Sequence, residues 1–265
     1  MATSSFLRNV NITTPKQAQR LVEALERAEK QRGEEVKMSR SVHEVKVEDA
    51  KSFFAKIKWS WHIEGFQKIN LLDVLKETDE ILVKEALEKF SCPLNAEVED
   101  FIRDKAIEFS RQRLASVWLV LASFRDEWVT VGYFALAQKY THIRTEKLSK
   151  TLRKRLNKFV TFDVELRDYL LSAPLIGQLG KNFVNGYDEL ITGDELLKIA
   201  CDTVAEGQRI FGGRVVYLEC EDIPALIDFY ERNGFVQFGQ RAPTGDERDK
   251  LKNHTFIQLL KYLRD

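Results

Sequence analysis

The hydrophobic and polar positions near the start of the chain predict an amphipathic helix over residues 14–33. Its apolar residues recur at helical spacing and would form one buried face: Ala18, Leu21, Val22, Leu25 and Ala28. Thr14 suits the N-cap position, Pro15 suits the first turn, and Gln17 completes a capping box. Gly33 is placed to end the helix.

The remainder of the first 75 residues carries weaker patterns. The segment "SVHEVKV" (41–47) alternates like a short strand, and a second helical stripe follows at Ala50, Phe53, Phe54 and Ile57. The segment "KWSWHIEGFQKIN" (58–70) is aromatic and irregular. We therefore expect a domain boundary near residue 75.

Beyond residue 75 the pattern predicts helices and strands in alternation. "EILVKEAL" (80–87) resembles a strand, residues 95–111 repeat like a helix, and "LASVWLVLA" (114–122) and "EWVTVGYFALA" (127–137) predict a hairpin around "SFRD". A basic helix, a strand at 174–183, a loop and a helix to about residue 210 come next. A buried strand "RVVYLEC" (214–220), a short helix 224–232 and a terminal hairpin of "FVQFG" (235–239) and "HTFIQLLKYL" (254–263) complete the order. This order predicts a mixed α/β fold with a mixed sheet.

Composition narrows the class of protein. The 265 residues contain 41 Lys and Arg against 41 Asp and Glu, which argues against bulk coating of nucleic acid but allows a local basic patch. The scattered cysteines Cys92, Cys201 and Cys220 fit a reducing compartment, and the four histidines show no metal-ligand spacing. With no apolar run of membrane-spanning length and no signal-peptide core, we expect a cytoplasmic protein without a metal site.

Several segments resemble the GNAT superfamily of N-acetyltransferases. "DIPALIDFYERNGFVQFG" (222–239) is similar to the family's closing helix and Gly-Phe strand. "EKFSCPLNAEVEDFIRDKA" (88–106) and "WVTVGYFALA" (128–137) resemble its narrower branch of toxins from toxin–antitoxin systems. The resemblance covers about residues 80–263 and implies a GNAT acyltransferase domain at 76–265, behind a mostly helical accessory region of unknown role at 1–75.

The resemblance implies acetyl-CoA as cofactor. Its pantetheine arm would pair with the strand at 178–183, and its pyrophosphate would rest on the loop before the next helix. Within the loop, the family's Gln/Arg-x-x-Gly-x-Gly/Ala pattern falls on Asp188, Ile191 and Gly193, of which only Gly193 matches. The cofactor-binding residues that this alignment implies are Gln178, Leu179, Gly180, Lys181, Asn182, Phe183, Leu190, Ile191, Thr192, Gly193 and Asp194.

The same loop has a purely structural interpretation. Thr192 and Glu195 form an ordinary capping box that opens an amphipathic helix. Four carboxylates, of Asp188, Glu189, Asp194 and Glu195, have the wrong charge for a phosphate cradle. Because a phosphate loop also ends in a capped helix, we interpret the segment as a degenerate cofactor loop.

Tyr230 is the candidate catalytic residue that the resemblance implies. A phenol beside the thioester sulfur could protonate the departing thiolate. The alternative is a packed core aromatic, because Leu226, Phe229 and Tyr230 share one helical face. Glu219 and Glu221 at a strand end could orient the attacking amine, but we expect them to be solvated charges.

The segment Arg144–Lys158 contains seven basic residues and one acidic residue. Its helix would place a narrow apolar stripe against the protein and leave six basic side chains around the remainder: Lys147, Lys150, Arg153, Lys154, Arg155 and Lys158. Charge runs usually form a solvated face, but this one also suits RNA phosphates. Both interpretations stay open.

The toxin branch acetylates the α-amino group of aminoacyl-tRNA, which the resemblance makes the leading acceptor. The alternatives are a small-molecule or peptide amine, or an inactive GNAT-fold module that regulates or binds RNA. The resemblance also brings an antitoxin protein and a homodimer into consideration as partners.

Overall fold

The computed structural model describes residues 3–45, 65–144, 146, 148–243 and 255–264. The chain divides into two compact units. Unit 1 comprises residues 1–35, 137–176 and 201–265, and unit 2 comprises residues 36–136 and 177–200. Each unit contains both strands and helices, so the fold is mixed α/β, as the sequence predicted.

The sheet of unit 2 has the strand order β9-β5-β4-β3-β2. Its strands are β2 (Val42–Glu44), β3 (Phe66–Asn70), β4 (Ser116–Phe124), β5 (Glu127–Ala137) and the greater part of β9 (Leu175–Lys181). The predicted hairpin is confirmed: β4 and β5 are antiparallel, and Arg125 and Asp126 adopt positive φ at its tip. β3 was not predicted, although Phe66 and Ile69 are fully buried on it.

Five helical segments of unit 2 lie between β3 and β4 in the chain. They are α3 (Leu71–Glu77), α4 (Glu80–Glu88), α5 (Ala96–Asp100), the π-helical turn η3 (Phe101–Lys105) and α6 (Ala106–Arg111). The last three together confirm the helix predicted over 95–111. Asn95 caps its start, because its side-chain oxygen accepts hydrogen bonds from the N–H groups of Glu97 and Val98.

The strand predicted at 80–87 is wrong, because these residues form α4. The β-branched and aliphatic run from Ile81 to Val83 favours a strand when it is read alone. Asp79 instead caps the start of a helix, because its side-chain oxygen accepts a hydrogen bond from the N–H of Ile81. Val83 and Leu87, four residues apart, then face the core while Ile81 stays exposed.

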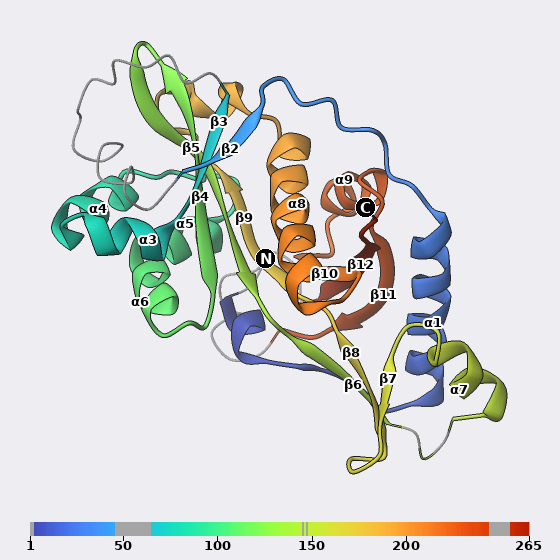
Figure 1. Cartoon of the computed structure of the whole chain (residues 1–265). Coiled ribbons are helices and arrows are strands. Elements are labelled where there is room, and N and C mark those ends of the chain that lie inside the picture. Colours follow the sequence, from blue (N-terminus) through green and yellow to red (C-terminus); the bar gives the residue numbers. More distant parts are fainter. Residues whose placement is uncertain (1–2, 46–64, 145, 147, 244–254, 265) are drawn as a thin grey trace. The chain divides into compact units, whose positions relative to one another are not determined.

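The main sheet of unit 1 has the strand order β11-β12-β10-β9 (Figure 1). Its strands are β10 (Val215–Glu221), β11 (Val236–Arg241), β12 (Phe256–Tyr262) and the first two residues of β9. β12 is antiparallel to both of its neighbours, which confirms the predicted terminal hairpin. The predicted helices α8 (Gly193–Phe211) and α9 (Pro224–Arg232) are also present, and α8 from Cys201 onwards belongs to this unit.

Helix α1 (Pro15–Lys30) packs on β11 and β12 in unit 1. The predicted capping box is confirmed: the N–H of Gln17 donates to the Thr14 hydroxyl, and the Gln17 side chain accepts from the N–H of Thr14. The predicted apolar stripe is buried throughout. The chain leaves α1 close to the end of α9, because a Cβ added to Gly33 would lie 2.5 Å from the carbonyl carbon of Asn233.

Unit 1 contains a second, smaller sheet that the sequence did not predict. Its order is β1-β6-β8-β7, formed by β1 (Val10–Ile12), β6 (Tyr140–Arg144), β8 (Asp168–Ser172) and β7 (Thr161–Asp163). The 3-10 turn η1 (Thr3–Leu7) precedes β1 in the chain. The predicted basic helix is real but short: α7 spans Lys150–Leu156, and Ser149 caps it.

The described part of residues 1–75 therefore contains both helix and strand. The helical stripe expected at Ala50, Phe53, Phe54 and Ile57 lies outside the described residues. The boundary at residue 75 stays a prediction. Among the described residues, no helix combines the length and the apolar character that crossing a membrane would require.

Candidate active site

Strand β9 carries four of the predicted cofactor residues, Gln178 to Lys181. In unit 2 taken by itself, β9 is an edge strand with β5 as its neighbour. Its pairing with β10 is restricted to Leu175 and Ile176. The backbone of residues 178–181 thus has an edge on which an extended chain of amide groups could bind.

Gly132 on β5 and Gly180 on β9 each leave no room for a side chain. A Cβ on Gly132 would lie 2.9 Å from the carbonyl oxygen of Gly180, and a Cβ on Gly180 would lie 2.3 Å from a methyl carbon of Val98. Tyr133, the next residue on β5, donates a hydrogen bond of 2.6 Å to the carbonyl of Val98. The "VGY" motif therefore has a packing role in holding β9 and α5 against β5.

Asn182 and Phe183, the next two predicted cofactor residues, fix the end of β9. The Asn182 N–H donates to the carbonyl of Val131 at 2.9 Å, and its side-chain amide donates to the carbonyl of Thr130 at 2.8 Å. The Asn182 side-chain oxygen accepts from the N–H of Ser91, while the N–H of Phe183 donates to the Ser91 carbonyl. The end of β9 is thus held by both β5 and the segment that follows α4.

The predicted phosphate loop begins with a 3-10 turn, η4 (Val184–Leu190). Asn185 and Gly186 adopt positive φ there, and Lys181 turns its ammonium group towards the turn, where it donates to the carbonyl of Asp188 at 2.9 Å. Ile191 is buried, and Gly193 begins α8. Leu190 to Asp194 therefore lie at a strand–turn–helix junction, as the sequence predicted.

Glu195 occupies the centre of this junction. Its carboxylate accepts hydrogen bonds from the N–H and hydroxyl of Thr192, at 2.9 and 3.0 Å, and the Thr192 hydroxyl accepts from the N–H of Glu195. The capping box that the sequence predicted is thus formed. The other carboxylate oxygen accepts from the N–H of Ser39 at 2.6 Å.

Burial is the largest single effect on the pKa of Glu195 and raises it, but the hydrogen bonds from Ser39 and Thr192 together lower that pKa below its ordinary value. Glu195 is therefore ionised and is bonded to groups of the protein itself. Of the four acidic residues in this segment, it is the one whose charge is turned inward.

Tyr230 lies on α9 and is 4% exposed. Its ring packs against those of Phe229 and Phe235, with centroids 4.9 and 5.8 Å away. Burial raises its pKa well above the ordinary value of 10, and the nearby thiols of Cys220 and Cys201 raise it further. The phenol stays protonated at neutral pH, which a proton donor requires.

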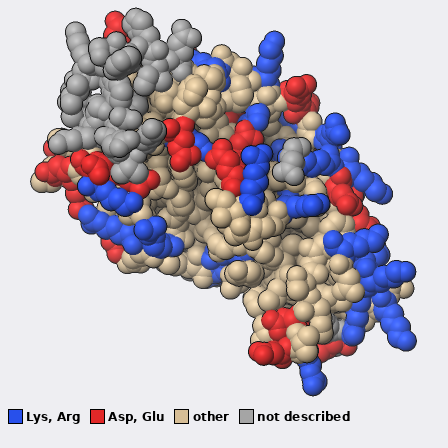
Figure 2. Space-filling view, viewed as in Figure 1, with Lys and Arg blue, Asp and Glu red and all other residues tan. Residues whose placement is uncertain are grey.

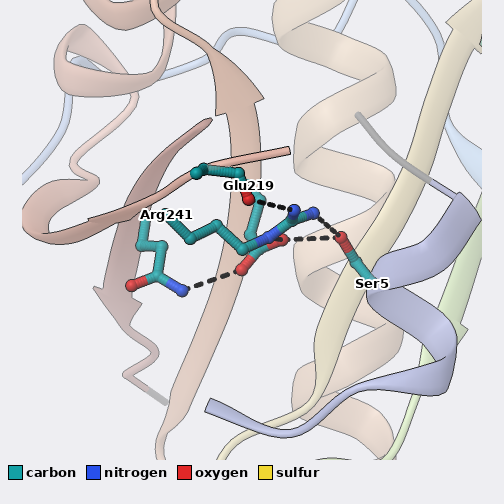
Figure 3. A network of polar contacts seen from close by, with 5 residues as sticks. Ser5, Glu219 and Arg241 are labelled. Atoms are coloured by element: carbon teal, nitrogen blue, oxygen red, sulfur yellow. Dashed lines mark hydrogen bonds and ion pairs between the residues drawn. The ribbon is translucent and has the colours of Figure 1, made fainter. Parts of the chain in front are cut away.

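The expectation that Glu219 and Glu221 are solvated is wrong, because both are buried on β10. Glu219 accepts hydrogen bonds from the Ser5 hydroxyl at 2.6 Å, Arg241 Nε at 2.6 Å and Gln258 Nε2 at 2.8 Å (Figure 3). The sequence could not reveal this network, since Ser5 and Glu219 are 214 residues apart.

The basic side chains of the predicted RNA surface are only partly available. Lys150, Arg153, Lys154 and Lys158 are exposed on or just after α7, and Lys147 lies outside the described residues. Arg155 is instead held by Glu26 of α1, with Nε and Nη2 at 2.9 and 2.7 Å from the two carboxylate oxygens. Figure 2 shows Lys and Arg side chains gathered over the region where Figure 1 places α1 and α7.

The cysteines and the possible metal ligands do not alter this description of the site. The three cysteines are free and buried, and burial raises the pKa of Cys92 and Cys220. No group of three or more His, Cys, Asp or Glu side chains in the described part of the chain is arranged to hold a metal ion.

The sequence matches no family model and no curated protein. The structure is similar to several solved structures at low sequence identity. AtaTR bound with acetyl-CoA is 12% identical over 72% of this chain and 91% of that one, with a TM-score of 0.41. A bacterial toxin is 15% identical over 67% and 83%, with a TM-score of 0.45. AtaT complexed with acetyl-methionyl-tRNAfMet is 14% identical over 64% and 85%, with a TM-score of 0.40.

Proposed function

We propose that the chain is a GNAT-type N-acetyltransferase that moves acetyl from acetyl-CoA directly to a primary amine. The observation that carries the proposal is β9 with the junction that follows it. A strand that pairs with β10 only through Leu175 and Ile176, a turn and a capped helix start follow one another directly, up to Glu195. Backbone amides at an edge suit a pantetheine arm, and a helix N-terminus suits a pyrophosphate.

The backbone of this segment fits acetyl-CoA, and some of its side chains fit as well. Gly193 has no side chain at the helix start, and Lys181 supplies a cation beside η4. Glu195 is bonded internally to Thr192 and Ser39, which reduces the repulsion that the sequence suggested. The backbone of 178–183 would hold the amide arm, and residues 190–194 the phosphates.

The group supplies an activated acetyl thioester when it is bound. The protein then has two tasks. Backbone N–H groups of β9 would donate hydrogen bonds to the acetyl carbonyl oxygen and stabilise negative charge there. Tyr230 would supply the proton that the departing sulfur requires, because its buried phenol stays protonated. The attacking amine must be neutral, and its proton leaves to solvent or a base after attack.

For the acceptor, we favour the α-amino group of aminoacyl-tRNA. The support is the exposed basic helix α7, whose exposed lysines suit a phosphate backbone. A small-molecule or peptide amine is the alternative acceptor, for which α7 would have no role. If aminoacyl-tRNA is the acceptor, an antitoxin protein would be the natural partner, because an enzyme that acetylates charged tRNA blocks translation.

A second candidate function has one observation in its favour. Asp188, Glu189 and Asp194 surround the proposed phosphate site, which weakens anion binding. A protein that kept the fold without catalysis would bind RNA or a partner instead. Titration of acetyl-CoA against the full chain separates the two, because a catalytic domain should bind at micromolar concentration.

The decisive experiment incubates the full chain with acetyl-labelled CoA and total charged tRNA. We expect label on the aminoacyl end of tRNA, released as an N-acetyl amino acid when the ester is hydrolysed at mild alkaline pH. Label on added polyamines or peptides, with none on tRNA, would move the acceptor to the small-amine class. No transfer to any amine, with no acetyl-CoA binding, would reject the enzyme and favour the inactive module.

A further inference from the structure

Unit 1 contains a cavity of about 490 Å³ that the proposed acetyl transfer does not use. One side is formed by residues 5–20, from η1, β1 and the start of α1. The other side is formed by β10, β11 and β12. The accessory region therefore supplies about half of a binding site, and the sheet supplies the remainder.

The floor of the cavity is a built polar site. Glu219, Ser5 and Gln258 line it, each at most 6% exposed, and they are joined by the hydrogen bonds drawn in Figure 3. Arg241 is the ionic partner of Glu219 at 2.6 Å and also donates to the Ser5 hydroxyl at 3.0 Å. Because these groups satisfy one another, the floor is rigid and carries no net charge.

The rim of the cavity is positive. Arg8 and Arg20 line it, both exposed, and neither side chain has an ion-pair or hydrogen-bond partner among the residues that the structure describes. Among the described residues of the lining, Glu219 is the one acidic residue, and Arg241 neutralises it. Two unpaired guanidinium groups at one opening favour an anion, and phosphate accepts paired hydrogen bonds from arginine.

The rest of the lining suits an organic group larger than phosphate itself. Tyr217 and Phe238 line it as largely buried aromatic rings in T-shaped contact, with ring centroids 6.4 Å apart, and Asn9, Asn11 and Gln240 supply amide donors and acceptors. A cavity of this volume holds a small organic molecule rather than a bare ion. Aromatic surface with amide groups is the chemistry that recognises a base.

We propose that this cavity binds a nucleoside monophosphate group, with the phosphate on Arg8 and Arg20 and the base towards Tyr217 and Phe238. The group can be a free nucleotide or the terminal nucleotide of an RNA. The proposal does not depend on acetyl transfer, because the cavity lies wholly within unit 1 and contains none of the residues assigned to that reaction.

The test measures binding to the full chain by calorimetry, with AMP and CMP as probes and with adenosine and inorganic phosphate as fragments. We expect saturable binding of at least one nucleotide and at least about tenfold weaker binding of each fragment. Substitution of Arg8 and Arg20 together by serine should weaken nucleotide binding at least about tenfold, since each loses a charge-assisted hydrogen bond.

Lys16→Ser is the matched control. Lys16 is exposed on α1, the helix that carries Arg20, but it lies outside the cavity lining. It should leave nucleotide affinity within about twofold. Both arginines are exposed, so the double variant should keep the thermal midpoint of the parent protein.

Competition with a short single-stranded RNA distinguishes the two sources of the nucleotide. RNA that displaces AMP and binds more tightly identifies an RNA end, and AMP that outcompetes the RNA identifies a free nucleotide; both support the site. Three results would overturn it: no saturable binding of any probe, unchanged affinity in the Arg8 and Arg20 variant, or an equal loss in Lys16→Ser.

Discussion

Arg155 of α7 and Glu26 of α1 form a two-point ion pair that joins the basic helix to the accessory region. Their side chains are about 30% exposed, so the pair is neither fully solvated nor fully buried. The hydrogen bond and charge of Arg155 lower the pKa of Glu26, against the smaller opposing effect of burial. Arg155 thus has a structural role in joining α7 to α1.

Arg155→Ser should lower the free energy of unfolding by about 1 kcal/mol, near the upper end for a partly exposed pair. Glu26→Gln should cause a similar loss, and the double variant little more, because one interaction is removed in each case. Denaturant unfolding measures all three. Lys154→Ser is the control: Lys154 is exposed, and its loss should change stability by less than about 0.5 kcal/mol.

The same pair should respond to pH. A carboxylate whose pKa is lowered on folding contributes stability above its unfolded pKa and loses it as the pH falls through its folded pKa. The stability difference between the parent protein and Glu26→Gln should therefore shrink as the pH falls below 4.5. A difference that persists in full at lower pH would show that packing, not charge, joins the helices.

The lysines around α7 should distinguish the acceptors. Changing Lys150, Lys154 and Lys158 together to serine should weaken tRNA binding and flatten its salt dependence, by up to about 0.9 log–log units per lost phosphate contact. Turnover of a small amine should hardly change. The matched control changes Lys76, Lys84 and Lys89, exposed lysines of unit 2, and should leave tRNA binding unchanged. Equal losses in both variants would mean that α7 is only solvated surface.

The parts of the fold that the sequence could predict are those with local signals. The capping box of Thr14 and Gln17 and the apolar stripe of α1 lie within one helix. The hairpin of β4 and β5 combines long apolar runs with a two-residue charged tip. Thr192 and Glu195 are three residues apart, so the start of α8 could also be predicted from the sequence.

The parts that could not be predicted depend on distant partners. β1 and β7 have three residues each, too few for a period, and β1 pairs with residues 141–143. Ser39 reaches Glu195 across 156 positions of sequence. In the candidate site, motif spacing identified β9 and the junction, but it could not show which carboxylate turns inward.

Gly180→Ala should destabilise unit 2 by about 1–3 kcal/mol, the usual cost of overpacking. The new Cβ would lie 2.3 Å from a methyl carbon of Val98, so β9 or α5 must shift. Val98→Ala removes that methyl and provides the control: the double variant should be less destabilised than the sum of the two single variants. Strict additivity in denaturant unfolding would show that the two residues do not meet.

Gly193→Trp should abolish acetyl-CoA binding while the domain stays folded. A large side chain at the first residue of α8 would fill the space where phosphates approach the helix start. Arg209→Trp is the control, because it places the same side chain on the last turn of the same helix. Unchanged affinity in calorimetry for Gly193→Trp would leave this segment as a capped helix only.

Tyr230→Phe removes one hydroxyl and keeps the ring that packs against Phe229 and Phe235. The variant should fold and bind acetyl-CoA, but its turnover at saturating substrate should fall about tenfold to a hundredfold, as expected for a lost general acid. Parent-like turnover would mean that Tyr230 only packs in the core and has no catalytic role.

The pH dependence gives a second, independent readout for Tyr230. Because its pKa is raised well above 10, the phenol stays protonated and no loss of turnover below pH 10 should arise from it. Above pH 10 the unfolded state releases the tyrosine proton more readily than the folded state, so stability should fall as the pH rises, and Tyr230→Phe should lessen that fall. A turnover that declines between neutral pH and pH 10 in the parent protein but not in Tyr230→Phe would mean that the phenol ionises in the folded enzyme and would contradict its assignment as a buried proton donor.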